Sequence, residues 1–276
     1  MAETRRQREK RLTRERMRLE AQMRKEIQRE MNRVVRQYRR DVRATGSESP
    51  ELLNEHRDRI RQLLIDSYGR TRRRFKGSVT ASLQVNPDNL QAFEDLVDTA
   101  FDQWKRKTSF TVSGQITATT RKNLVTSVNL ARAARQLGLP PMTNAELAAN
   151  SSEVLRRILT NRAKQIAVSE TTNGIETANR AEAEAAAGQV PDIGRGLGLQ
   201  PAVPPEPAQV MKEWVMMEDE LVRPAHVEAH GQRVALSEAF IVGGESLQYP
   251  RDTSMGASLG MIINCRCRSR YVKVTK

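Results

Sequence analysis

The segment KEWVMMEDELVRPAHVEAHG at residues 212–231 is followed by LQYPRDTS at 247–254 and by INCRCRSRY at 263–271. Together these segments hold both cysteines, two of the three histidines and one of the two tryptophans. The apolar run around Trp214 is typical of a short strand, and residues 223–230 predict one or two helical turns that end at a glycine. This part of the chain is therefore expected to fold as a small α+β domain.

Strands are also expected at 239–242 and 262–274, whereas the chain before residue 188 mostly has the apolar periodicity of helices. Glycine and proline dominate the segment between these two parts, as is typical of a linker. The predicted fold class is α+β: a predominantly helical N-terminal body with long basic helices, followed by a small α+β C-terminal domain. The predicted domains are a basic amphipathic helical arm at 1–46, a helical body at 47–187, a linker at 188–210 and the small domain at 211–276.

The first 44 residues form a strongly basic segment. They contain 16 lysines and arginines against 7 acidic residues, which supplies most of the formal charge of +13. Apolar residues recur there mostly three or four positions apart, at Leu12, Leu19, Met23, Ile27, Met31, Val34, Tyr38 and Val42. This pattern predicts one long helix that is either charged and exposed or uses a narrow apolar seam to pack on a partner or on another copy.

Excess positive charge favours acidic partners and binds nucleic-acid phosphates without reading the base sequence. Aromatic residues make up only 4% of the chain, so a platform for stacking bases is not expected. No apolar run is long enough for a membrane span, and no secretory signal is recognised. The arginines predicted to contact double-stranded DNA are Arg5, Arg6, Arg11, Arg14, Arg18, Arg72, Arg73 and Arg74.

Two local patterns mark helix boundaries in the helical body. Thr143 and Glu146 are spaced as a capping box that begins a helix. Residues 108–120 are rich in threonine and serine and contain a glycine, so they are expected to form a loop or a short strand. A helix is expected to follow at 119–137.

Two constellations in the C-terminal segments could carry chemistry. His226 and His230 share one face of a helix, and Cys265 and Cys267 share one face of a strand. Two imidazoles and two thiolates suit tetrahedral zinc, although a C-x-C spacing is tighter than in zinc fingers. The favoured reading is instead a set of small buried cysteines and ordinary histidines, so no cofactor and no metal are expected.

Asp219, Arg223 and His226 are spaced four and three residues apart, so on a helix they would form a row. A histidine oriented by a carboxylate could act as an acid or base, with Arg266 nearby, which would make the chain a nuclease, transferase or toxin-like enzyme. The alternative is a buried polar network that fixes a small domain. Without a phosphate-binding glycine loop or a nucleophile motif, a non-enzymatic protein is the expected reading.

The order of several residues resembles the C-terminal domain of the phage Mu F-like minor head proteins, the phage head-morphogenesis family. The residues that carry this resemblance are Trp214, Asp219, Arg223, His226, Gly231, Tyr249-Pro250, Asp252 and the run Asn264-Cys265-Arg266-Cys267. The helix around Ser169-Glu170-Thr171-Thr172 resembles the segment that precedes this domain. The match covers roughly residues 150–272, and no family motif is recognised in the N-terminal 140 residues.

The resemblance implies a minor or internal head protein of a tailed phage or prophage, acting in head morphogenesis. Its expected partners are portal and capsid proteins, packaged double-stranded DNA bound non-specifically and, through the N-terminal helices, copies of itself, with no membrane contact. Its expected location is the inside of the virion head near the portal, and during assembly it is expected in the host cytoplasm.

Overall fold

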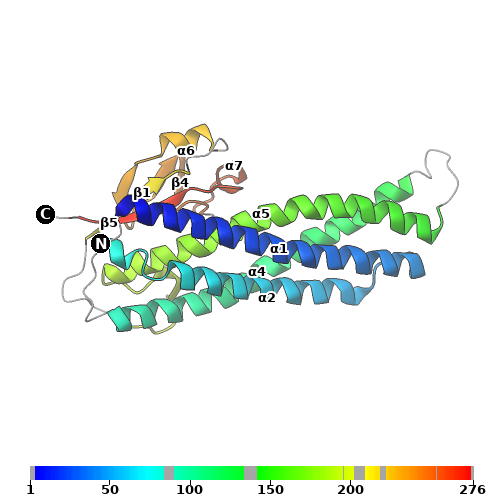
Figure 1. Ribbon diagram of the computed structural model, residues 1–276, viewed down its shortest axis with the longest axis horizontal. Helices are drawn as coiled ribbons and strands as arrows, with labels where there is room; N and C mark the ends of the chain where they lie inside the picture. The colour runs from blue at the N-terminus through cyan, green and yellow to red at the C-terminus, as the bar shows by residue number, and fades with distance from the viewer. Residues whose placement is uncertain are drawn as a thin grey trace. The chain divides into compact units, whose positions relative to one another are not determined.

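The computed structural model describes residues 4–83, 90–133, 142–194, 196–201, 209–217, 222–252 and 254–274 (Figure 1). Four long helices dominate the chain: α1 (Arg5–Thr45), α2 (Pro50–Phe75), α4 (Leu90–Ala133) and α5 (Asn144–Ala186). Short antiparallel strands follow them, so the predicted α+β class with long N-terminal helices is confirmed. Among the described helices, none combines the length and the apolar character that a bilayer span requires.

Strand β1 is the centre of a three-stranded antiparallel sheet with the order β2-β1-β5. Its register pairs Lys212 with both Val234 of β2 and Tyr271 of β5. Strands β3 and β4 form a separate hairpin whose turn residues Gly243 and Gly244 both have positive φ, which favours glycine. The short elements are α3 (Thr80–Leu83), η3 (Asp192–Gly194), β1 (Val210–Val215), α6 (Pro224–Glu228), β2 (Arg233–Ala235), β3 (Phe240–Val242), β4 (Glu245–Leu247), α7 (Leu259–Ile262) and β5 (Arg268–Lys273).

The chain divides into two compact units, and the boundaries between them fall inside the four long helices. The units therefore do not follow the predicted domain ranges. The C-terminal strands belong to the same unit as the first turns of α1, because residues from both ends bond to each other. One example is Arg16, which donates hydrogen bonds to the carbonyl of Arg266 and to Thr172 Oγ1. The first unit is Met1–Leu19, Tyr68–Arg106 and Val168–Lys276; the second is Glu20–Ser67 and Lys107–Ala167.

The second unit is built from segments of the four long helices. The apolar seam predicted for α1 is buried here, with Met23, Ile27, Met31, Val34, Tyr38 and Val42 at most 1% exposed. One polar group joins three of the segments: the His56 Nδ1 atom lies 3.0 Å from Glu30 Oε1, and its Nε2 atom lies 3.3 Å from Thr120 Oγ1. The seam is therefore part of the core of this unit, and the faces of α1 that could meet a partner are its charged ones.

The predicted loop or strand at 108–120 is wrong, because α4 continues through it without interruption. The hydroxyl groups that suggested a loop bond back to helix carbonyls three or four residues earlier, as at Thr111, Ser113, Thr119 and Thr120. Gly114 is tolerated inside the helix at a cost of about 1 kcal/mol relative to alanine. The predicted separate helix at 119–137 is accordingly the last part of α4, described as far as Ala133.

The capping box at the start of α5 is confirmed. Thr143 N donates to Glu146 Oε2 at 2.8 Å, and Glu146 N donates to Thr143 Oγ1 at 3.2 Å. These reciprocal bonds satisfy two amide groups that a helix start leaves without intrahelical partners. The helix therefore begins where the local sequence alone places it.

Candidate metal centre and nucleic-acid interface

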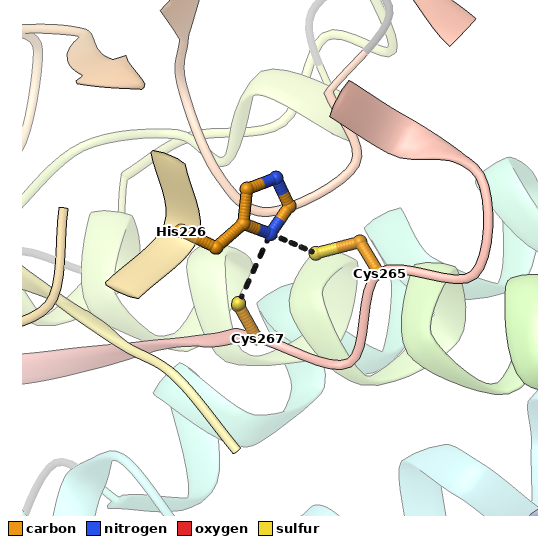
Figure 2. Close-up of side chains that lie close together, drawn as sticks. All are labelled: His226, Cys265 and Cys267. Atoms are coloured by element: carbon orange, nitrogen blue, oxygen red, sulfur yellow. Dashed lines mark hydrogen bonds between the residues drawn. The ribbon is translucent and has the colours of Figure 1, made fainter. Parts of the chain in front are cut away.

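Three side chains with metal-binding atoms converge in the first unit (Figure 2). His226 comes from α6, while Cys265 and Cys267 come from the segment between α7 and β5. The Nδ1 atom of His226 lies 3.6 Å from Cys265 Sγ and 3.4 Å from Cys267 Sγ. All three residues are buried, and both thiols are free.

The backbone on either side of the cysteines is held by two arginines. Arg223, directly before α6, donates to the carbonyl of Ile263, and Arg16 donates to the carbonyl of Arg266. Between these anchors Asn264 adopts a φ of 55°, a left-handed conformation that asparagine tolerates better than most residues. The turn at Asn264 and the two anchored carbonyls direct both sulfurs toward α6.

Apolar and aromatic residues enclose the cluster. Trp214 of β1 is fully buried, and its ring meets the His226 ring edge-on at a centroid distance of 5.6 Å. Phe240 of β3 also packs edge-on against Trp214, with a ring centroid distance of 5.4 Å. The predicted strand around Trp214 and the predicted helical turns around His226 are thus both present, and they form one core with the cysteines.

The two thiols differ in acidity. The hydrogen bond from Cys267, and then the His226 imidazole, lower the pKa of Cys265 despite its burial. The neighbouring Cys265 and burial raise the pKa of Cys267. The two pKa values therefore shift in opposite directions, and Cys265 is the thiol that ionises more readily.

Other residues of the predicted constellations have different roles. His230 lies apart from the cluster: it is exposed, and its Nδ1 atom is 3.3 Å from the Met216 amide. Arg223 serves the Ile263 carbonyl, and Asp219 lies outside the described residues. Of the predicted row, Arg223 and His226 are described, and His226 joins Cys265 and Cys267; the part assigned to Asp219 stays a prediction.

Asp252 is a structural residue. It is fully buried, and its carboxylate accepts hydrogen bonds from the amides of Gln248 at 2.9 Å and Ser254 at 2.8 Å. These bonds stabilise the turn in which Arg251 has a φ of 74°. Asn264 is exposed and Arg266 half-buried, whereas both cysteines between and after them are buried. The strand predicted over 262–274 is present only as β5, so the two cysteines lie before the strand and not on one of its faces.

Most arginines predicted to bind DNA lie on the surface of the first unit. Arg6, Arg11, Arg14, Arg18, Arg73 and Arg74 are exposed, while the side chain of Arg5 lies outside the described residues. Arg72 is a correction: it is buried, with its Nε atom 2.7 Å from Asp98 Oδ1 and a second ion pair to Glu182. Its guanidinium is occupied by carboxylates and is not available to a phosphate.

A basic groove on the second unit was not predicted from the sequence. It has a volume of about 1110 Å³ and lies between α1 and α5. The cationic side chains that line it are Arg24, Lys25, Arg29, Arg36, Arg156 and Arg157, and none of its described lining residues is acidic. Lys25, Arg29 and Arg36 recur at helical spacing on the side of α1 opposite the apolar seam, which is the sequence signal for this face.

Comparison with protein-family models, with characterised proteins and with solved structures found no match to this chain.

Proposed function

We propose that this chain is a minor or internal head protein of a tailed phage or prophage, which acts in head morphogenesis and binds double-stranded DNA without sequence preference. The resemblance of residues 214–267 to the Mu F-like domain supports the first part. The observation that carries the second part is the basic groove of the second unit, which is lined by residues of α1 and α5. The proposal is non-enzymatic and includes portal and capsid proteins as partners.

The charge of the groove suits a phosphate backbone. Arg24, Lys25, Arg29 and Arg36 are exposed and lie on one helix, and Arg156 and Arg157 face them from α5. Contacts of this kind release counterions from DNA, so affinity falls steeply with salt. Six phosphate contacts would reduce affinity about 10³-fold between ~50 and ~200 mM salt.

The test compares two matched variants of the full-length protein, each lacking three exposed arginines. One combines Arg24→Gln, Arg29→Gln and Arg36→Gln in the groove, and the control combines Arg6→Gln, Arg14→Gln and Arg18→Gln. Binding to labelled duplexes of two unrelated sequences is followed by fluorescence anisotropy across a salt series. We expect equal affinity for both sequences, and a decrease of about 2 to 3 in the logarithmic salt slope for the groove variant, larger than the decrease for the variant of the N-terminal arginines, which are also predicted to contact DNA.

Two results would count against this assignment. A salt-independent affinity would remove the electrostatic basis of the proposal. A loss of slope in the control variant with no loss in the groove variant would assign DNA contact to the N-terminal arginines. Mass spectrometry of purified virions tests the proposed location inside the head, near the portal.

A further inference from the structure

We propose that His226, Cys265 and Cys267 bind one Zn²⁺ ion. This site is separate from the basic groove and does not depend on the proposed contact with DNA. The chain supplies the ligands from two places far apart in the sequence, α6 and the segment before β5. The ion would therefore join these two segments inside the first unit.

The distances between the donor atoms match a tetrahedral zinc site. Zinc binds thiolate sulfur at about 2.3 Å and imidazole nitrogen at about 2.0–2.1 Å, so a tetrahedral angle separates nitrogen from sulfur by about 3.5 Å. The observed separations from His226 Nδ1 are 3.6 Å to Cys265 Sγ and 3.4 Å to Cys267 Sγ. All three donor atoms lie within 4.8 Å of one another, which leaves room for one ion between them.

Hydrogen bonding alone does not account for this convergence. The Nδ1 atom of a neutral imidazole has either one proton or one lone pair, so it forms one good hydrogen bond. Here two sulfurs approach the same nitrogen, and Nε2 of His226 is buried without a partner among the described residues (Figure 2). A cation shared by all three donors satisfies both sulfurs and the nitrogen together.

The donor set selects the kind of metal. Two thiolates and an imidazole are soft to intermediate ligands that favour zinc over magnesium or calcium, whose ligands are oxygen atoms. Three protein ligands leave the fourth tetrahedral position for a water molecule or another ligand.

The first experiment uses the full-length protein purified without chelators. Zinc is measured by inductively coupled plasma mass spectrometry, and the ligands are identified by X-ray absorption spectroscopy at the zinc edge. We expect about one zinc per chain, with a first shell of two sulfurs and one nitrogen. Because the chain has only two cysteines, thiol alkylation gives an independent measure: both should resist alkylation until a chelator is added.

Matched variants identify the ligands. His226→Asn should lose zinc, whereas His230→Asn, which removes an exposed imidazole four residues away, should retain about one zinc per chain. Cys265→Ser and Cys267→Ser should each weaken zinc binding at least tenfold in a competition titration with a chromophoric chelator. Circular dichroism of each variant separates loss of the ligand from loss of the fold.

Several outcomes would overturn the proposal, and the first of them are measured on the unmodified protein. One is a protein that contains well below one zinc and takes up none when refolded with the metal. Another is a zinc shell without sulfur, or a disulfide between the two cysteines in the freshly purified protein. Equal loss of zinc in His226→Asn and His230→Asn would also exclude the assigned ligand set.

Discussion

Arg72 and Glu182 form a buried ion pair in the first unit, with side chains 7% and 1% exposed. The same carboxylate accepts hydrogen bonds from the Gly77 amide at 3.0 Å and from the Val79 amide at 3.1 Å. This pair fixes the turn between α2 and α3, where Gly77 has a φ of 75°. An arginine in a basic cluster thus serves the fold, while Arg73 and Arg74 beside it are exposed.

Replacing Arg72 should destabilise the protein strongly. Arg72→Ala leaves Glu182 as a buried charge without its partner, for which we expect a loss of about 3–5 kcal/mol in the free energy of unfolding. Arg73→Ala is the control and should change it by less than about 0.5 kcal/mol, because that residue is exposed. Urea unfolding measures both variants. Equal small effects would show that the ion pair does not hold this turn.

Glu176 should make stability depend on pH. Its side chain is fully buried, its Oε2 atom accepts a hydrogen bond from the Ser269 amide at 2.9 Å, and burial raises its pKa from 4.5 to about 7. The folded state therefore keeps a proton that the unfolded state loses above pH 4.5. Its contribution to stability is complete below pH 4.5 and disappears as the pH rises through 7, a difference of about 3 kcal/mol.

The measurement for Glu176 is the free energy of unfolding between pH 4.5 and 8. Glu176→Gln should remove the decline, because an amide does not ionise. Subtracting the two curves cancels other titrating groups, which both proteins share. A difference that does not change with pH would contradict the predicted protonation.

Thr143 should stabilise the start of α5 by itself. Thr143→Ala removes the hydroxyl that accepts a hydrogen bond from the Glu146 amide. Caps of this kind contribute about 1 kcal/mol to the free energy of unfolding. The control is Thr111→Ala within α4, where the exposed hydroxyl bonds the Lys107 carbonyl 3.3 Å away. Alanine favours a helix interior, so this control should be neutral or slightly stabilising in a thermal melt. A matching loss at both positions would argue against the capping role.

Glu153 should restrain DNA binding. Its carboxylate pairs with Arg156 at 2.7 Å and with Arg157 at 3.0 Å, two cations that line the basic groove. Glu153→Gln releases both guanidinium groups, so we expect tighter binding to duplex DNA, by about two- to fivefold at low salt, and a steeper salt dependence.

A carboxylate in the first unit provides the matched control for Glu153. Asp102 also pairs with two cations on one helix, Lys105 at 2.5 Å and Arg106 at 3.7 Å, away from the groove residues in sequence. Asp102→Asn makes the same change in charge and should leave the salt slope unchanged. Similar gains in both variants would indicate a response to net charge alone.

Features set by neighbours in the sequence were predictable. The seam of α1, the capping box of α5 and the helical turn at His226 all follow from spacings of three or four residues. The continuity of α4 was not, because threonine and serine bonded to helix carbonyls look the same in sequence as loop residues. The helix propensities of these residues alone therefore did not distinguish a continuous helix from a loop.

The candidate metal centre depends on pairings across the chain. His226 meets cysteines 39 and 41 residues away, and the segment that carries these cysteines is held by bonds from Arg223 and Arg16. The groove similarly joins residues near 30 with residues near 156. Neither distance leaves a periodic signal along the sequence.

The hydrogen bonds from Arg16 to the Arg266 carbonyl and from Arg270 to the Glu9 carboxylate also have a kinetic consequence. They join positions 250 and 261 residues apart, so the first turns of α1 emerge from the ribosome long before their partners in this unit exist. Contacts of such long sequence separation form slowly. The second unit ends at residue 167, so its helices are complete while the sheet is still unsynthesised, which predicts that it gains protection from proteolysis first on ribosome-bound chains.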